Sequence, residues 1–356
     1  MRSIDQQEAF TGICSRLRGG MTTSLGGYAG TGKSTLLKMV YDELSPEGHI
    51  ETITATGKAA SVLQKKGVPA RTVHSFLYNF HGYGDNDEPI FKGKNRVARP
   101  RWLFVDEASM ITDDMQKQIE KHDLCTFYVG DPGQLPPVKS SKFEPIADPT
   151  FLLTKIHRQC EGNPIIEFAH AIRNGSCSIE DDFPGIRHLD GLGMTSLEVA
   201  RYCVANDITQ MITATNARRI LLNDSVRSIF GRDWPLVVQD KLICLRNDYD
   251  YGVLNGQQFE VFEIKASNSM TYTIVLVDED KRKLTIDIDR NQLGNGTLTS
   301  PEDAVGALFD YGYAVTCHKF QGSSSPHVGI VGSRRGDVEW QYTAVTRAEK
   351  DLTIFR

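Results

Sequence analysis

The sequence predicts an α/β fold of two units, with a small β-hairpin inserted in the first unit and a small β-barrel inserted in the second. Over the first part of the chain, short apolar runs alternate with helical patterns, which is typical of a parallel sheet. Four later segments instead alternate apolar and polar residues between turn signals, as the strands of an antiparallel barrel do. These segments are 242–245, 259–264, 271–277 and 283–288. The α/β pattern resumes at about residue 311, so we expect the barrel to be an insertion and not a tail.

The composition is that of a globular protein with more than one domain. A chain of 356 residues is long enough for two or three cores, and 40% hydrophobic and 24% charged residues are ordinary values. The net charge of −5 gives no overall basic footprint, which argues against bulk coating of nucleic acid but allows a local basic groove. The seven cysteines are scattered and include no C-x-x-C pair, so we expect neither a zinc site nor a disulfide framework. This cysteine usage indicates a reducing compartment.

The sequence carries no targeting signal that we recognise. Its first residues, MRSIDQQE, lack the apolar core of a signal peptide, and no apolar run is long enough to cross a membrane. We therefore expect the protein in the cytoplasm, that of the host if the gene belongs to a phage.

The elements of the first unit follow from local patterns. Helices are expected at 34–44 and 59–65, and strands at 51–56, 102–105 and 125–129. The strand expected at 21–25 is unusually polar, so we expect it to be short or near an edge of the sheet. Between residues 78 and 98 a turn-rich run and a basic run interrupt the pattern, which indicates the inserted hairpin or loop.

The second α/β unit is expected to begin near residue 151, and the barrel to cover about 237–300. The other elements expected in this unit are a strand at 210–215, a helix at 217–230, strands at 327–331 and 352–355, and a helix that ends near Arg347.

The sequence GYAGTGKS at residues 27–34 fits the P-loop pattern G-x-x-x-x-G-K-[ST] in full. Its glycines allow the backbone to bend around a polyphosphate, toward which the loop N–H groups and the next helix N-terminus point. Lys33 is expected to reach the β- and γ-phosphates, and the Ser34 hydroxyl to bind Mg²⁺. The residues expected to contact the nucleotide are Gly30, Thr31, Gly32, Lys33, Ser34 and Thr35.

A second motif supplies what a P-loop needs for hydrolysis. The apolar strand 102–105 ends in Asp106, placed to bind Mg²⁺, and in Glu107, which could activate water. Together the two motifs predict hydrolysis of a nucleoside triphosphate. In GDPGQLPP at 130–137, the Gln134 amide could sense the γ-phosphate or orient the attacking water. The alternative is a proline-stiffened loop with a solvated Gln134.

Two arginines outside the first unit are candidates for neutralising charge in the transition state. Arg158 lies near the start of the second unit, and Arg347 lies at the end of the helix near the C-terminus. The alternative is that both form surface ion pairs, which is the usual fate of a lone arginine.

The order of these motifs resembles that of superfamily 1 DNA helicases. The resemblance is closest to the 5′→3′ branch, superfamily 1B, which includes RecD-like helicases and the phage Dda helicase. The matching runs extend over nearly the whole chain, from Gln6 to Arg347. In chain order they are QQEAF, GYAGTGKS, TATGKAA, TVHSF, VDEAS, GDPGQLPP, IHRQ, YAVTCHKFQGS and YTAVTRA.

The resemblance implies an architecture, cofactors and a partner. It implies two RecA-like motor domains, the first at 1–150 and the second formed by 151–236 and 301–356. It also implies a pin that splits the duplex at 78–98 and an SH3-like barrel at 237–300. ATP and Mg²⁺ are the implied cofactors, and single-stranded DNA and junctions with duplex DNA are the implied partners.

The resemblance also assigns roles to single residues. Gln6 is the expected reader of adenine, with a solvated N-terminal glutamine as the alternative. The expected DNA-binding residues are Thr54, Thr56, Lys58, His74, Phe76, Asn216, Thr316, His318 and Lys319. For the two histidines, the alternative is a satisfied interior residue. Three aromatic residues of the pin are candidates for the wedge or, equally, for core anchors: Phe80, Tyr83 and Phe91.

Three functions remain open at this point. The leading one is an ATP-driven 5′→3′ DNA helicase that works as a monomer, with replication or recombination proteins as partners. The second is a helicase of opposite polarity, against which the small inserts and the barrel argue. The third is an ATP-dependent DNA-binding or translocase subunit that grips DNA within a complex without unwinding it.

Overall fold

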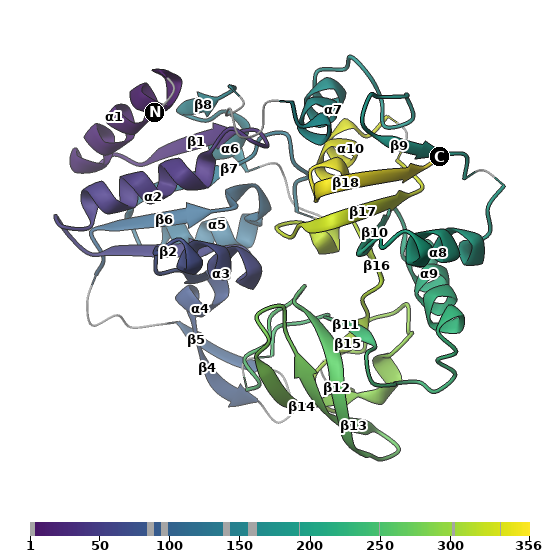
Figure 1. The fold of residues 1–356 in the computed structure, drawn as a ribbon. Helices are drawn as coiled ribbons and strands as arrows, with labels where there is room; N and C mark the ends of the chain where they lie inside the picture. The colour runs from purple at the N-terminus through teal and green to yellow at the C-terminus, as the bar shows by residue number, and fades with distance from the viewer. Residues whose placement is uncertain are drawn as a thin grey trace. The chain divides into compact units, whose positions relative to one another are not determined.

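The computed structural model describes residues 4–83, 89–93, 99–137, 143–155, 162–191, 193–248, 250–300, 303–334 and 336–356 (Figure 1). The chain divides into two compact units. The first comprises Met1–Asn79, Phe91–Ser176 and Val338–Thr346, and the second comprises Phe80–Ile90, Cys177–Asp337 and Arg347–Arg356. The expected boundary at residue 151 therefore falls inside the first unit, because helices before Ser176 and near the C-terminus pack there.

The first unit is built on a six-stranded parallel sheet in the order β3-β2-β6-β7-β1-β8. Thr54 is in register with Asp106, and Gly26 with Gly130. The carboxyl ends of the four central strands therefore meet at one edge of the sheet, where ligands bind in open α/β sheets. The strands are β1 (Thr23–Gly27), β2 (Ile50–Thr54), β3 (Arg71–Thr72), β6 (Trp102–Asp106), β7 (Cys125–Gly130) and β8 (Phe151–Leu153).

Helices bury the apolar residues of this sheet in two clusters. One cluster joins α1, α2 and α3 to the strands, and in it the Trp102 indole N–H donates to the Leu17 carbonyl at 2.8 Å. The other contains residues of α4 and α5, such as Phe76 and Ile119. The helices are α1 (Ile4–Arg18), α2 (Lys33–Leu44), α3 (Gly57–Lys65), α4 (Val73–Leu77), α5 (Asp113–Glu120), α6 (Glu144–Ala147), α7 (Pro164–Arg173) and α10 (Val338–Val345).

The polar strand before the P-loop, β1, lies near the edge of the sheet as predicted, but it spans Thr23–Gly27 and not 21–25. It has five residues, all buried, and it lies second from the edge, between β7 and the short edge strand β8. The Ser24 hydroxyl accepts a hydrogen bond from the Thr150 backbone N–H at 2.9 Å. A polar side chain can thus be buried near the edge because a neighbouring loop supplies its partner.

The second unit contains a five-stranded parallel sheet in the order β16-β10-β17-β18-β9. Two helices belong to it, α8 (Ser196–Ala205) and α9 (Asn216–Ile229). Thr195 and Glu198 form a capping box at the start of α8, and the Thr215 side chain caps α9. The strands are β9 (Arg187–Leu189), β10 (Gln210–Thr213), β16 (Ala314–Thr316), β17 (Ser325–Val331) and β18 (Ala348–Phe355).

An antiparallel five-stranded sheet is inserted between α9 and β16, in the order β14-β13-β12-β11-β15. Its strands enclose an apolar cluster that includes Phe259, Ile274 and Phe309. The last strand follows residue 300, where the insertion was expected to end. That three-residue strand comes after a stretch rich in turn residues, which hid it in the sequence. The strands are β11 (Lys241–Cys244), β12 (Gln258–Ser267), β13 (Thr271–Val277), β14 (Lys283–Asp289) and β15 (Phe309–Tyr311).

The segment expected to form a hairpin contains two strands, β4 (Tyr78–Tyr83) and β5 (Pro89–Gly93), which pair in a two-stranded sheet. They lie in the chain between α4 and β6, as expected for an insertion between two sheet strands. Residues 84–88 and 94–98, which include part of the expected tip, lie outside the described residues.

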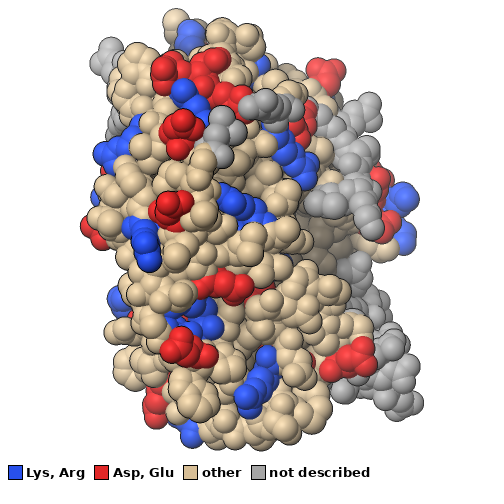
Figure 2. Space-filling model, turned by 90° about the vertical axis from the view of Figure 1, so that its right-hand side faces the viewer, with Lys and Arg blue, Asp and Glu red and all other residues tan. Residues whose placement is uncertain are grey.

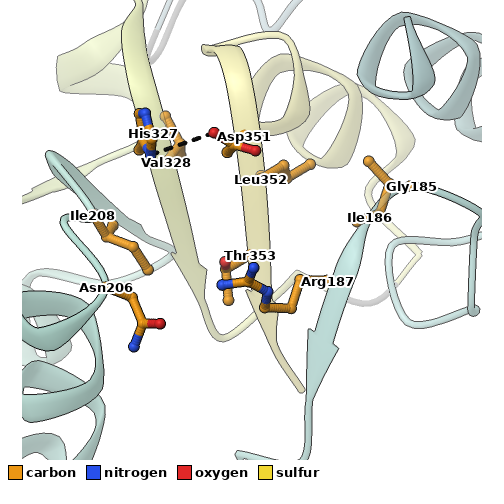
Figure 3. Close-up of a pocket in the computed structure, with 10 residues that line it drawn as sticks. All are labelled: Gly185, Ile186, Arg187, Asn206, Ile208, His327, Val328, Asp351, Leu352 and Thr353. Atoms are coloured by element: carbon orange, nitrogen blue, oxygen red, sulfur yellow. Dashed lines mark ion pairs between the residues drawn. The ribbon is translucent and has the colours of Figure 1, made fainter.

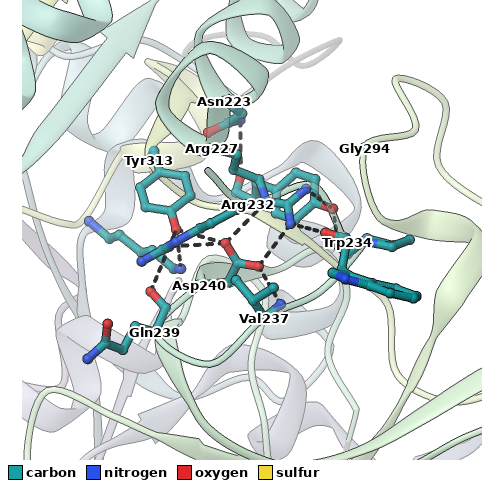
Figure 4. A network of polar contacts seen from close by, with 12 residues as sticks. Asn223, Arg227, Arg232, Trp234, Val237, Gln239, Asp240, Gly294 and Tyr313 are labelled. Carbon is teal, nitrogen blue, oxygen red and sulfur yellow. Dashed lines mark hydrogen bonds and ion pairs between the residues drawn. The ribbon is translucent and has the colours of Figure 1, made fainter. Parts of the chain in front are cut away.

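A buried charged network joins the inserted sheet to α9 (Figure 4). The Asp240 carboxylate is within 3.2 Å of the Arg227 guanidinium and within 3.1 Å of that of Arg232. It also accepts hydrogen bonds from the Tyr313 hydroxyl and the Val237 backbone N–H, each at 2.9 Å. Both carboxylate oxygens of Asp240 are thus hydrogen-bonded, as a buried carboxylate requires.

The surface carries charges of both signs. On the face shown in Figure 2, lysine and arginine side chains intermingle with aspartate and glutamate. This mixture agrees with the small net charge of −5. Within the part of the chain that the structure describes, no helix has the length and apolar character needed to span a membrane.

Candidate functional site

The carboxyl edge of the first sheet brings together most of the residues predicted to bind and hydrolyse a nucleotide. The P-loop follows β1, Asp106 ends β6, and the loop that carries Gln134 follows β7. These strands are neighbours in the sheet, so three segments far apart in the sequence lie side by side (Figure 1).

The P-loop has the backbone that its glycines allow. Gly30 and Gly32 have φ angles of 78° and 85°, a region that favours glycine. A Cβ atom at Gly27 would lie 2.8 Å from the side chains of Lys33 and Thr31. No side chain caps the N-terminus of α2 at Gly32, so the first-turn N–H groups are left for an anion.

Lys33 already contacts acceptors at this edge. Its ammonium group donates to the Tyr28 carbonyl at 3.2 Å and lies 3.6 Å from a carboxylate oxygen of Asp131. The Asp131 side chain has no exposed surface. A phosphate bound in the loop would carry more charge than this carboxylate and would compete for the Lys33 ammonium.

Asp106 is a buried carboxyl group with features of a cation ligand. Burial, and then the charge of Glu107, raise its pKa to about 7. A divalent cation would remove this penalty, and the Ser34 hydroxyl in the first turn of α2 could share the cation. Within the described ranges, no group of three or more His, Cys, Asp or Glu could hold a metal ion. A Mg²⁺ ion here would therefore need phosphate or water oxygens as further ligands, which Mg²⁺ commonly takes.

Glu107 and Gln134 are each held in an unusual state. Glu107 has φ 52° and ψ 40°, the left-handed region, at the start of the short helix η1 (Ala108–Met110). Gln134 is only 6% exposed, and its amide oxygen is buried with no hydrogen-bond partner among the described residues. The solvated alternative for Gln134 is therefore wrong. An unpaired buried acceptor costs free energy, so a partner such as a water held for reaction would stabilise it.

Gln6, the residue predicted to read adenine, lies beside the P-loop. Gln6 is 5% exposed, and its amide N–H donates to the carbonyl of Thr31 in the P-loop at 3.2 Å. A solvated glutamine is therefore excluded here too.

The two predicted arginines have different outcomes. Arg158 lies outside the described residues. Arg347 belongs to the second unit, is 7% exposed, and donates to the Ser323 carbonyl at 2.9 Å. It is therefore not the exposed surface arginine of the alternative reading.

In the first unit, the predicted DNA-binding residues lie at or after the carboxyl ends of β2 and β3, and two of them, Thr54 and Phe76, are fully buried. The Thr54 hydroxyl donates to the Thr56 carbonyl at 2.6 Å, and the Thr56 hydroxyl caps α3, which begins just before Lys58. His74 lies on α4, where burial lowers its pKa. Phe76 is fully buried, with its ring 5.4 Å from that of His122. Phe76 was predicted to bind DNA, but its ring is part of the core and is not available to a base.

In the second unit, three of the four predicted DNA-binding residues, Asn216, Thr316 and Lys319, line one hollow of about 230 Å³. Asn295 of the inserted sheet lines it too, a residue that no sequence motif singled out. The Lys319 ammonium donates to the Leu245 carbonyl at 2.9 Å, and burial lowers its pKa to about 8. Lys319 thus braces the inserted sheet in this structure. The fourth predicted residue, His318, begins the short helix η3 (His318–Phe320), and burial lowers its pKa.

A larger hollow of about 460 Å³ lies elsewhere on the second unit, over β9, β17 and β18 (Figure 3). His327 and Asp351 form an ion pair of 3.4 Å at one side of it. None of the residues predicted to act in catalysis or binding lines it.

The fold and the site define a P-loop protein with two parallel α/β units. A family model described as an AAA domain matches residues 2–186, which is more than half of the chain, and a model of the UvrD-like helicase C-terminal domain matches residues 311–355. The chain belongs to the AAA domain family, and over most of its length it is similar to superfamily 1B helicases.

Individual relatives agree with this placement. The chain is 29% identical over 385 residues to the ATP-dependent RecD2 DNA helicase of Deinococcus radiodurans, a match that covers 98% of this chain and 48% of that protein. It is 29% identical over 277 residues to the ATP-dependent DNA helicase dda of Enterobacteria phage T4, covering 71% of this chain and 62% of that protein. The chain thus spans about half the length of the RecD2 protein.

A solved structure described as two coordinating Pif1 helicases that unwind forked double-stranded DNA has a similar fold. Its TM-score is 0.64 at 18% sequence identity, and the match covers 99% of this chain and 92% of that chain. At this identity the likeness shows a shared fold alone.

Proposed function

We propose that this chain is an ATP-driven DNA helicase that moves 5′→3′ on single-stranded DNA and unwinds duplex DNA. One observation carries the proposal: a single sheet edge holds the P-loop with Lys33, the buried Asp106, the strained Glu107 and the buried Gln134. Mg²⁺ and ATP fit this set, because it offers anion-binding N–H groups, a cation-seeking carboxyl group and a base beside them.

Each residue has a role in this proposal. Lys33 and the α2 N-terminus would hold the phosphates, and Ser34 and Asp106 would hold Mg²⁺, whose charge would offset that of the phosphate oxygens. Glu107 accepts a proton from the attacking water, which Gln134 orients. Arg158 and Arg347 neutralise charge that develops in the transition state.

The nucleic-acid side of the proposal rests on sequence-independent contacts. Hydroxyl and amide groups of Thr56, Asn216 and Thr316 can meet a phosphate backbone without reading bases, and the buried Thr54 positions the Thr56 carbonyl. Two relatives are described as ATP-dependent DNA helicases, and a structure of similar fold is described with forked double-stranded DNA. These descriptions support ATP as the hydrolysed nucleotide and DNA as the substrate. We further propose RecA-like motor domains, the inserted sheet as an SH3-like barrel, residues 78–98 as the pin, and a cytoplasmic monomer.

The test is unwinding of matched duplexes that carry either a 5′ or a 3′ single-stranded tail, with Lys33→Ala as the inactive control. ATP-dependent strand separation from the 5′ tail alone supports the proposal. Separation from the 3′ tail alone would establish the opposite polarity. ATP hydrolysis stimulated by DNA without strand separation would instead indicate a DNA-binding or translocase subunit.

A further inference from the structure

The tip of the P-loop is held by a tyrosine from the far end of the chain. The backbone N–H of Ala29 donates to the Tyr342 hydroxyl at 2.8 Å, and that hydroxyl donates to the Asp131 carboxylate at 2.9 Å. Tyr342 lies on α10 and is fully buried. Its hydroxyl is therefore a fixed link between the P-loop and the loop after β7.

The P-loop N–H at Ala29 is consequently not free for a phosphate. Its carbonyl is also engaged, because it accepts a hydrogen bond of 3.2 Å from Nε2 of His170 on α7 when that nitrogen carries the proton. The Arg173 guanidinium, also on α7, lies 3.4 Å from the centre of the Tyr28 ring. Residues 28 and 29 of the P-loop are thus held by side chains of α7 and α10, two helices that come after the strands of the first sheet in the sequence.

Asp131 is the point at which this link meets the nucleotide site. One of its carboxylate oxygens faces both the Tyr342 hydroxyl and the Lys33 ammonium, the latter at 3.6 Å. The other accepts from the Gly133 backbone N–H at 2.9 Å, in the loop that carries Gln134. A phosphate that binds the Lys33 ammonium removes a positive charge from beside Asp131. Because the Tyr342 hydroxyl donates to the same carboxylate oxygen, its hydrogen bond is affected by this change.

α10 and this loop are tied at further points. The Leu135 backbone N–H donates to the Thr343 hydroxyl at 2.9 Å. A Cβ atom at Gly133 would lie 3.1 Å from the Tyr342 ring, so ring and loop are already in close contact. The first compact unit ends at Thr346, and the chain enters the second unit at Arg347, directly after α10.

We propose that Tyr342 is a positioning residue. When a phosphate binds Lys33, the change at Asp131 and Ala29 alters the hydrogen bonds of the Tyr342 hydroxyl. Through these bonds, phosphate binding shifts the Gln134 loop and α10. The inference rests on the proposed nucleotide hydrolysis and adds to it the route by which phosphate binding reaches the segment before Arg347. The hydroxyl does not touch the reacting atoms; it acts through Asp131 and the P-loop backbone.

The first test removes the hydroxyl alone. Tyr342→Phe should lower the DNA-stimulated kcat by about 5- to 10-fold, the size expected for one buried hydroxyl hydrogen-bonded at two points, with KM for ATP changed by less than about twofold. Tyr128→Phe is the matched control, since this tyrosine of β7 is also buried and burial raises its pKa to about 12. We expect the control to retain the wild-type kcat. A wild-type kcat in Tyr342→Phe, or a parallel loss of nucleotide binding and thermal stability, would overturn the proposal.

The second test observes α10 directly and does not depend on DNA. The protein has three tryptophans, and the fully buried Trp340 lies on α10 one half-turn before Tyr342. With 5-fluorotryptophan incorporated, Mg²⁺–ADP should shift the ¹⁹F resonance of Trp340 in the wild type and leave that of the exposed Trp234 in place. The shift should be lost in Tyr342→Phe; assignments come from Trp234→Phe and Trp340→Phe.

The possible outcomes distinguish a failure of the coupling through Tyr342 from a failure of the proposed nucleotide hydrolysis. If Mg²⁺–ADP binds, by calorimetry, without moving the Trp340 resonance, the coupling through Tyr342 is refuted and nucleotide use stands. If neither Mg²⁺–ADP nor Mg²⁺–ATP binds the wild type, the proposed hydrolysis fails and the coupling fails with it.

Discussion

Glu107 shows how single residues at the site depart from their ordinary states. A non-glycine residue in the left-handed region costs on the order of 1–3 kcal/mol, and such strain persists only where the surroundings enforce it. Here the end of β6 and the start of η1 fix the backbone on both sides. The strain therefore supports a role for Glu107 that a relaxed loop residue would not need.

Substitutions at Lys33 and Glu107 should separate nucleotide binding from turnover. Lys33→Ala removes the cation that holds the phosphates, so ATP binding should weaken and turnover should vanish. Glu107→Gln keeps the side-chain shape and the backbone but removes the base, so binding should persist while kcat falls by ~10²–10⁴-fold. Fluorescent-nucleotide titration and steady-state hydrolysis measure the two effects. Substantial hydrolysis by Glu107→Gln would remove Glu107 from its role.

Asp106 should make stability depend on pH. Its folded-state pKa of about 7 lies above the value of ~3.9 for an unfolded chain. The stability that the protonated group contributes is fully present below the unfolded pKa and is lost as pH rises through the folded pKa. Without divalent cations, the Tm of the wild type should therefore fall relative to that of Asp106→Asn between about pH 4 and pH 7 and level off above the folded-state pKa of about 7. Mg²⁺–ADP should flatten this trend, because the cation compensates the carboxylate. A Tm difference independent of pH would contradict the assignment.

The position of a residue could be predicted from the sequence where a motif fixes the backbone. It could not be predicted where the direction of the side chain depends on packing in the core. Lys33, Asp106 and Gln134 meet at one edge because strand ends in a parallel sheet must meet there. Phe76 lies in a motif run, yet its ring points into the core, and no sequence spacing distinguishes those two directions. Lys319 was expected to face DNA but contacts Leu245, a partner 74 positions away in the chain.

At the scale of elements, predictions succeeded where local signals are strong. Helix α2 was expected at 34–44 and begins one residue earlier, at Lys33, directly after the P-loop. The strand β13 matches its expected range of 271–277 because its polar and apolar residues alternate. Strand β15 was missed, since three residues are too few for any periodicity and pairing with β11 alone defines it.

The network around Asp240 should be a main support of the inserted sheet. Asp240→Ala would leave the nearly buried guanidinium groups of Arg227 and Arg232 without their carboxylate, at a cost of ~3–5 kcal/mol. Glu43→Ala is the matched control, because it removes a carboxylate that pairs with Arg18 on the exposed surface. Urea denaturation should show a large loss of unfolding free energy for the first variant and little change for the second. Equal effects would show that burial does not set the strength of these pairs.

At the scale of the whole molecule, the sequence indicated two α/β units but not where they divide. Helix α7 and helix α10 group with the first unit, although both follow the expected boundary. The contacts responsible join Tyr342 to Ala29 and His170 to Ala29, pairs separated by 313 and 141 positions. Neither contact leaves a local pattern, so only the folded chain reveals them.

The last prediction separates the motor from the duplex-splitting element. The motor motifs belong to the two α/β units, so stepping along a single strand should not require the hairpin of β4 and β5. Residues 82–88 are rich in turn-forming residue types, and a segment of this kind tolerates replacement by a short Gly/Ser turn. We expect this variant to keep DNA-stimulated ATP hydrolysis and 5′→3′ translocation but to lose most unwinding from a 5′ tail.

A second turn replacement is the control for this variant. The turn at 278–282 joins β13 to β14 in the inserted sheet, and the same Gly/Ser substitution there should leave unwinding unchanged. Wild-type unwinding by the 82–88 variant would show that this hairpin is not the pin. Loss of ATP hydrolysis as well would show that the hairpin belongs to the ATPase domains or to their DNA-binding surface. A rigid element that only separates strands at a fork is not needed for hydrolysis on a single strand.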